Sequence, residues 1–289
     1  MGGGSFSLSS FTSYSKSLGR HYDACSGKVS GQRYTASRLK EILNPKGKNR
    51  ECANSEEHPS TIPVILALDV TGSMGRACDE TAASIGIIMK DLYSKFKDIE
   101  FCVMGIGDFE YDDAPLQVSQ YESDVRIAES IDNLWLEKGG GGNHYESYSA
   151  AWYFGLYHTK LDAFDKQGRK GIIITMGDEP LNPDLPANRL KDYLDEKQVG
   201  EVKTSELYKK ANEKFDIYHI SINDSSSSYN TPGGRYENEV DESFRNVIGN
   251  HYKVSTINGL SKAIVDCIDD SITHENHQMV QDNEEGITW

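Results

Sequence analysis

An apolar run that ends in one acid and two hydroxyls does most to constrain the fold of this chain of 289 residues. Residues 62–68 are continuously apolar, which is typical of a parallel strand buried on both faces. Asp69 closes the run, and Thr71 and Ser73 follow at alternate positions in a glycine-rich turn. Such a turn can direct a carboxylate and two hydroxyls at one point. Hard oxygen ligands of this kind suit Mg²⁺ or another small divalent cation.

Strands and helices alternate beyond residue 61. The expected strands are 62–68, 100–106, 116–118, 170–175, 215–222 and 251–254, and the expected helices are 80–96, 124–136, 148–159, 189–196, 205–214, 241–248 and 259–272. This order predicts an α/β, Rossmann-like fold with a mostly parallel central sheet and helices on both faces. Ligands of such sheets bind outside the carboxyl ends of the strands.

Two later segments place further polar side chains at the same predicted edge. Asn143 follows a run of glycines and precedes the helix at 148–159, and Asp178 follows the strand at 170–175. We therefore expect both side chains to converge on Asp69. Asp108 lies in an acidic loop at 107–113, directly after another predicted strand.

The segment from Asp69 to Ser73 resembles the D-x-[ST]-x-S signature of the von Willebrand factor A (vWA) domain, where it forms the metal-ion-dependent adhesion site, or MIDAS. Many vWA domains carry Gly-Gly-Thr before a helix, and that Thr is the third ligand. Here the sequence is Gly-Gly-Asn, so Asn143 is the candidate, with Glu146 and Ser147 as alternatives. The next strand of the family usually ends in Thr-Asp-Gly. Met176 takes that Asp position here, and Asp178 lies two residues later.

The resemblance implies a vWA-like domain at 61–273, with insertions near 181–205 and 224–240. An N-terminal extension (1–60), with a helical pattern only at 35–43, and an acidic C-terminal tail (274–289) flank it. Residues 51–55 and 142–148 also resemble a bacterial and phage subgroup of intracellular vWA proteins.

The resemblance further implies recognition and no enzymatic activity. The metal would be Mg²⁺, with Mn²⁺ or Ca²⁺ as alternatives, and a partner protein would complete its shell with an Asp or Glu. Asp108 would orient metal-bound water. Intracellular bacterial vWA proteins often work beside AAA+ ATPases, which is the partner class implied. The implied ligands are Asp69, Thr71, Ser73, Asn143 and Asp178.

Two other functions remain open from the residues alone. Residues 71–75 approximate the G-x-S-x-G elbow of α/β-hydrolases, with Ser73 as nucleophile. Asp178 and then His219 or His251 follow in the order that this class uses. The third possibility is a structural component of an assembly that keeps the fold and binds no metal.

Composition limits the classes of binding partner and the cellular compartment that we expect. The formal net charge is −15, from 30 basic and 45 acidic residues, which disfavours nucleic acid and anionic membrane. The five cysteines are scattered, and neither a signal peptide nor an apolar run of the ~18 residues that span a bilayer is visible, so we expect a cytoplasmic protein. The phosphate-loop and dinucleotide fingerprints are missing. The aromatic residues between 145 and 157 are expected to divide between the core and an interaction patch.

Overall fold

The computed structural model describes residues 4–23, 26, 28–31, 36–137, 142–197, 200–225, 227 and 229–285. Within these ranges, the side chains of residues 73, 75, 76, 78, 82 and 274–285 lie outside the description. Ser73, a predicted metal ligand, is therefore placed only by its backbone.

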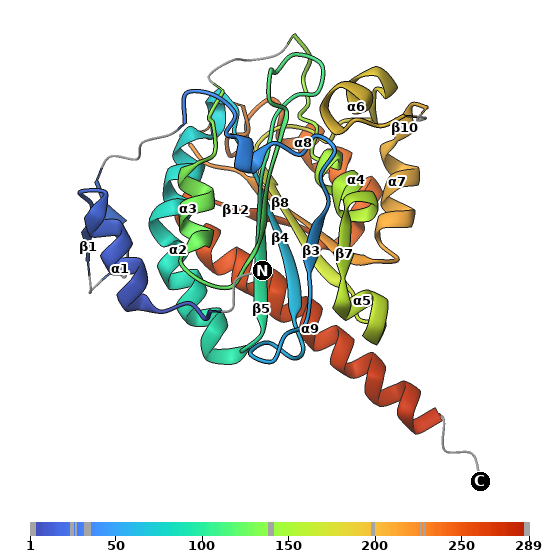
Figure 1. Cartoon of the computed structure of the whole chain (residues 1–289). Coiled ribbons are helices and arrows are strands. Elements are labelled where there is room, and N and C mark those ends of the chain that lie inside the picture. The colour runs from blue at the N-terminus through green and yellow to red at the C-terminus, as the bar shows by residue number, and fades with distance from the viewer. Residues whose placement is uncertain are drawn as a thin grey trace.

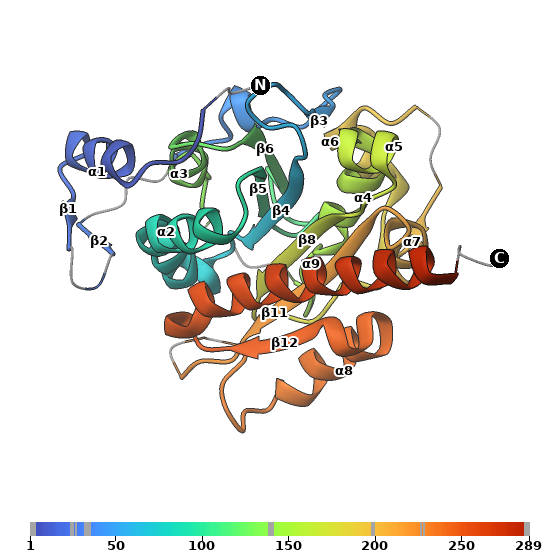
Figure 2. The ribbon, with the colours of Figure 1, turned by 90° about the horizontal axis from the view of Figure 1, so that it is seen from below.

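A six-stranded sheet forms the centre of the molecule (Figure 1). Its strands lie in the order β12-β11-β8-β4-β5-β6, which can be followed in Figure 2. Its neighbouring strands are parallel except for the β5–β6 pair, which is antiparallel. The strands are β4 (Ile62–Asp69), β5 (Ile99–Ile106), β6 (Leu116–Glu122), β8 (Gly171–Gly177), β11 (Phe215–Ile222) and β12 (Tyr252–Ser255). The predicted mostly parallel α/β sheet is confirmed.

Helices cover both faces of the sheet, so β4 is buried on both sides (Figure 2). Val64 and Leu66 pack with α2 (Gly75–Lys95), α3 (Arg126–Asp132) and α9 (Leu260–Glu285). Ile65 and Ala67 pack in the other core layer, with α4 (Ser149–His158), α6 (Ala187–Leu194), α7 (Thr204–Ala211) and α8 (Glu237–Ile248). This double burial explains why the strand is a continuous apolar run.

The N-terminal extension is more ordered than its sequence indicates. Helix α1 (Leu8–Ser17) inserts Phe11 against Gly86 of α2, where an added Cβ would lie 2.4 Å from the Phe11 ring. Arg20 donates two hydrogen bonds of 2.8 and 2.9 Å to the Asp132 carboxylate on α3. The short strands β1 (His21–Tyr22) and β2 (Val29–Ser30) pair beside it. The helix expected at 35–43 is wrong, because only the 3₁₀ turn Glu41–Leu43 forms there among the described residues.

Other boundaries also differ from expectation. Helix α2 begins at Gly75, five residues early, directly after the 3₁₀ turn Gly72–Met74. Helix α9 continues to Glu285 and projects beyond the body of the molecule (Figures 1 and 2). The segment 181–205 holds α6 between two short paired strands, β9 (Asp184–Leu185) and β10 (Val202–Lys203). Within the described residues, no helix is both long enough and apolar enough to cross a membrane.

The aromatic segment is mostly core. Tyr148, Trp152, Tyr153 and Phe154 are buried, whereas Tyr157 is 51% exposed. The remaining elements, β3 (Arg50–Cys52), β7 (Thr159–Leu161) and α5 (Asp162–Gln167), lie beside this layer, with β3 and β7 paired in parallel. The aromatic series therefore divides between buried and accessible side chains, and the interaction patch stays a prediction.

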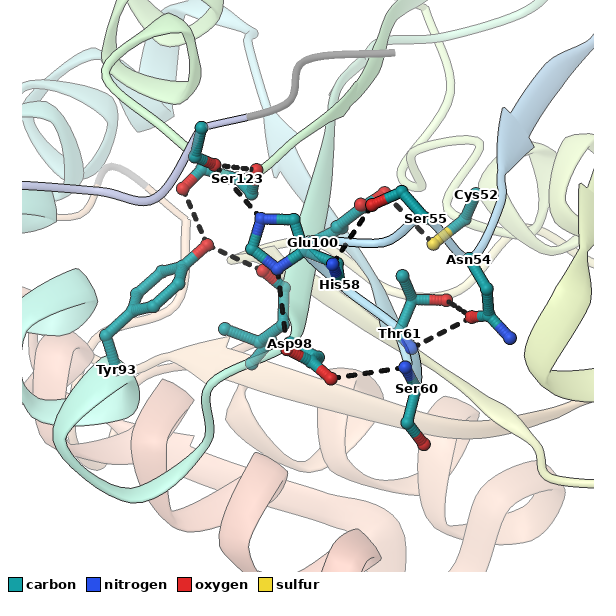
Figure 3. Close-up of polar contacts among 12 residues, drawn as sticks. Cys52, Asn54, Ser55, His58, Ser60, Thr61, Tyr93, Asp98, Glu100 and Ser123 are labelled. Atoms are coloured by element: carbon teal, nitrogen blue, oxygen red, sulfur yellow. Dashed lines mark hydrogen bonds and ion pairs between the residues drawn. The ribbon is translucent and has the colours of Figure 1, made fainter.

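A buried polar cluster closes the amino-terminal end of β4 and β5 (Figure 3). His58 lies 3.2 Å from the Gly4 carbonyl through Nε2 and 3.5 Å from Asp98 through Nδ1. The Tyr93 hydroxyl donates to the carbonyl of Ser123 at 2.7 Å. These bonds fasten the start of the described chain to the sheet, at the edge opposite the predicted metal site.

Candidate functional site

The predicted site residues gather at the carboxyl edge of three neighbouring strands. Asp69 is the last residue of β4, Asp108 follows β5 by two residues, and Asp178 directly follows β8. Because β8, β4 and β5 are adjacent and parallel, the loops after them emerge side by side. This is where ligands of open parallel sheets bind.

The Asp69 carboxylate is fully buried and held by hydrogen bonds on both oxygens. Its Oδ1 accepts from the Thr71 backbone N–H at 2.9 Å and from the Thr71 hydroxyl at 2.6 Å. Its Oδ2 accepts from the Tyr148 hydroxyl at 2.7 Å. The turn that follows β4 thus bends back onto its own acid, as short Asp-initiated turns do. Asp69 and Thr71 lie together as the sequence predicts.

Asp178 is also fully buried, and its carboxylate Oδ2 accepts from the Ser227 hydroxyl. Met176 is buried in the core layer that contains α2 and α9. Burial raises the pKa of Asp69 to about 7, and the second cause is the negative charge of Asp178. The two acids are therefore close enough for their negative charges to repel each other.

Tyr148 belongs to this site, although no sequence pattern predicts a role for it there. Its hydroxyl joins Asp69 to the next loop, because it also accepts from the Glu179 backbone N–H at 3.3 Å. A Cβ at Gly177 would lie 1.9 Å from that hydroxyl, so glycine is needed for space. A glycine at the end of an apolar strand, where another backbone or side chain approaches closely, was the available signal.

Further carboxylate side chains make this region strongly acidic. Burial raises the pKa of Glu179 to about 8, and the charges of Asp69 and Asp178 add to the shift. Burial also raises the pKa of Glu146 well above its usual range, with Asp69 as the largest charge contribution. Asp112 accepts from the Asp108 backbone N–H at 2.7 Å, and burial raises its pKa to about 6.

The candidates for a third ligand occupy different places. The Ser147 hydroxyl accepts from the Phe109 backbone N–H at 2.9 Å and so joins two loops. Asn143 is half-buried beside Asp108, where its amide opposes the upward shift of the Asp108 pKa that burial causes. Glu146 is buried and carries an Oε2 without a hydrogen-bond partner.

The donor set fits a hard divalent cation. Two buried acids repel each other, a hydroxyl lies beside one of them, and a cation between them would offset the repulsion. In the part of the chain that the structure describes, no three Asp, Glu, His or Cys side chains are close enough to hold an ion by themselves. A cation at Asp69 would therefore depend on hydroxyl and water ligands as well as carboxylates.

The alternative hydrolase triad is not assembled among the described side chains. His219 lies 2.9 Å from the Thr175 hydroxyl through Nδ1 and stacks on Phe244, and His251 lies 3.1 Å from the Ile217 carbonyl. Neither of these hydrogen-bonding partners is an acid. The acid–histidine contact that orients a catalytic base is missing from this arrangement.

No protein-family model and no curated protein matches the chain. Among solved structures, it is similar to the pilus adhesin SpaC from Lactobacillus rhamnosus GG, with a TM-score of 0.47 and 12% identity over 78% of this chain and 31% of the adhesin. It is similar to proximal thread matrix protein 1 from the mussel byssus with a zinc-occupied MIDAS motif, with a TM-score of 0.44 and 13% identity over 72% of this chain and 48% of that protein. It is also similar to BatB from Bacteroides thetaiotaomicron, with a TM-score of 0.43 and 13% identity over 73% of this chain and 99% of BatB. At these identities and TM-scores, the similar structures do not support any conclusion about function. The function is therefore inferred from the site.

Proposed function

We propose that this chain is a metal-dependent protein-interaction module. The observation that carries the proposal is the pair of fully buried, mutually repelling acids, Asp69 and Asp178, at the carboxyl edge of the sheet. Asp69 and Thr71 would hold the metal together with Ser73, whose spacing in the sequence fits. Asp178 would act directly or through water. Mg²⁺ suits such a site best, with Mn²⁺ and Ca²⁺ as alternatives.

The chemistry of these ligands favours a cation that binds a partner protein over a cation that is merely stored. Hydroxyl groups such as that of Thr71 donate oxygen without negative charge, so a divalent cation keeps positive character. When bound, it supplies an electrophilic position for a carboxylate. The partner would therefore be a protein that presents an Asp or Glu, and ordinary interface contacts around the metal would set its identity.

The wider assignments follow from the sequence resemblance and the charge. We propose a cytoplasmic protein of the intracellular vWA type that works beside an AAA+ ATPase and is not an enzyme. A net charge of −15 disfavours acidic partners that lack the metal contact.

Thermal unfolding after chelation tests the metal site. Saturating Mg²⁺ or Mn²⁺ should raise the Tm of the wild type, since about 100-fold excess over Kd stabilises a folded protein by ~2.7 kcal/mol. Asp69→Asn keeps the shape of the side chain and should remove the part of this increment that the cation at Asp69 provides. Asp113→Asn is the matched control, because Asp113 is an exposed acid of the neighbouring loop. An equal increment in Asp69→Asn would exclude Asp69 as a ligand.

Capture of partners from the source cell tests the interaction. Proteins retained in Mg²⁺ should be released by EDTA, and should not bind the Asp69→Asn variant. Esterase, peptidase and phosphatase assays should show no turnover. Turnover that disappears in Ser73→Ala would establish the hydrolase instead, and retention in EDTA would contradict the metal-bridged contact.

A further inference from the structure

Two loops at the carboxyl edge are joined directly by hydrogen bonds. The Ser147 backbone N–H donates to the Gly107 carbonyl at 3.4 Å, and the Phe109 backbone N–H donates to the Ser147 hydroxyl at 2.9 Å. Asp108 lies between the two residues that bond to Ser147, and Glu146 immediately precedes Ser147. The loops therefore hold Asp108 and Glu146 beside each other.

Each of these acids carries a buried oxygen that forms no hydrogen bond, and the amide of Asn143, the side-chain donor beside Asp108, has its own Nδ2 buried without a partner. Asp108 is 1% exposed and Glu146 is 3% exposed. Asp108 Oδ1 accepts from the Glu110 backbone N–H at 2.8 Å, but its Oδ2 is buried without a hydrogen-bond partner. Glu146 Oε2 is likewise buried without one. Buried carboxylate oxygens are normally paired with a donor or a cation, so two such oxygens in adjoining loops indicate a missing ligand.

The charges around these oxygens favour a cation as that ligand. Glu146 experiences the negative charges of four acids, which are, from largest to smallest effect, Asp69, Glu179, Asp112 and Asp108. The Arg189 guanidinium is the positive charge that acts on Asp108, but it donates its hydrogen bond to the Glu110 carbonyl and leaves Asp108 Oδ2 without a partner.

The two unpartnered oxygens belong to other segments than the turn that carries Asp69. Thr71 and Tyr148 hold both oxygens of Asp69 in the loop after β4, whereas the unpartnered oxygens belong to the loop after β5 and the segment before α4. Backbone bonds fix both acids in place: the Asp108 carbonyl accepts from the Asp112 N–H at 2.9 Å, and the Glu146 N–H donates to the Pro180 carbonyl at 3.2 Å.

We propose that a second hard divalent cation binds between Asp108 Oδ2 and Glu146 Oε2, next to the cation at Asp69. Water would complete its shell, since two carboxylate oxygens leave most positions of a hard cation open. The second cation would tie the loop at 107–113 to the segment before α4 and neutralise part of the charge beside Asp69. This proposal depends on the proposed function only in assuming that the first cation binds at Asp69.

The stoichiometry of Mn²⁺ binding to the full chain tests this site. Free Mn²⁺ would be followed by its electron paramagnetic resonance signal during titration of metal-free protein. We expect two Mn²⁺ ions per wild-type chain, and one in Asp108→Asn/Glu146→Gln. One ion should also remain in Asp69→Asn, now at the second site. Asp113→Asn, in the same loop but exposed, should keep both.

The outcomes separate this inference from the proposed function. One ion in the wild type, lost in Asp69→Asn, would leave the proposed function standing and overturn the second site. One ion that is weakened by Glu146→Gln and lost in Asp69→Asn would make Glu146 a ligand of the first cation and also overturn it. Two ions bound by Asp108→Asn/Glu146→Gln would also overturn the second site. If the double variant does not fold by circular dichroism, Asp108→Asn and Glu146→Gln are titrated singly, and each should lose the second ion.

Discussion

The Tyr148 hydroxyl joins Asp69 to the loop after β8. It donates to Asp69 and accepts from the Glu179 backbone, and it reaches this position because residue 177 is glycine. One side chain thus couples two strand ends at the candidate site. The position of Asp69 is set as much by α4, which carries Tyr148 at its N-cap, as by its own turn.

Removal of the Tyr148 hydroxyl should lower the stability of the folded protein. Tyr148→Phe leaves a buried acceptor and a buried N–H without their partner, so we expect a loss of about 1–3 kcal/mol in the free energy of unfolding of the metal-free protein. Urea unfolding monitored by circular dichroism measures it. Tyr153→Phe is the control: its hydroxyl donates to the half-buried Glu196, and its loss should cost about 1 kcal/mol or less.

A double-mutant cycle with Gly177 shows whether space is the reason for the glycine. Gly177→Ala should displace the Tyr148 hydroxyl and destabilise the fold by about 1–3 kcal/mol. Tyr148→Phe should then cost clearly less in the Gly177→Ala background than in the wild type. Equal costs in both backgrounds would mean that Gly177 does not control the position of Tyr148.

His219 should make the protein acid-sensitive. Burial lowers its pKa well below the ordinary value, so at pH below about 6.5 the unfolded chain binds a proton that the folded state does not. The stability that depends on neutral His219 is complete above pH 6.5 and is lost as the pH falls. His219→Gln should reduce the slope of unfolding free energy against pH, between about pH 6.5 and 5, by up to ~1.4 kcal/mol per pH unit. His21→Gln, at an exposed histidine, is the control.

Local residue patterns predict contacts only when both partners lie close in the sequence. The bonds between Asp69 and Thr71 are two residues apart and follow from turn chemistry. The bond from Tyr148 spans 79 residues and requires knowledge of how α4 packs on the sheet. Ser227 and Glu179 were missed for the same reason.

At the scale of elements, burial determined which predictions succeeded. Strand β4 is buried on both faces, so its sequence is apolar throughout and was recognised. Helix α1 is rich in serine and buries little beyond Phe11 and Ser15, so its sequence shows no clear apolar stripe. The 35–43 segment has a helical pattern but forms only one 3₁₀ turn, because contacts elsewhere overrule propensity.

The contact between α1 and α2 should depend on Gly86. Gly86→Leu puts a side chain where the Phe11 ring now lies, so α1 should leave the surface while the sheet stays folded. Limited trypsin digestion should then cut at Lys16 and Arg20 much faster than in the wild type. Lys90→Leu, at an exposed position of α2, is the control. Equal protection of both variants would show that α1 is held by other contacts.

The whole molecule is strongly acidic, and its candidate site adds buried acids to an acidic surface. A net charge of −15 opposes binding of phosphate polymers, because affinity for them depends on clustered Lys and Arg. The same charge attracts divalent cations toward the sheet edge. Composition alone is enough to predict this global behaviour, because the prediction needs no knowledge of where individual side chains lie.

A binding assay with duplex DNA therefore distinguishes an acidic protein partner from a partner that binds through phosphate. In EDTA we expect no binding by fluorescence anisotropy, even at about 50 mM salt, where phosphate contacts are strong. In Mg²⁺ a bare metal position could capture phosphate as well as carboxylate, but the surrounding charge of −15 should still prevent it. Binding that appears with Mg²⁺ and disappears in Asp69→Asn would make phosphate the ligand of the site and contradict the proposed acidic protein partner. Binding that is equal in both variants would point instead to a basic surface elsewhere on the molecule.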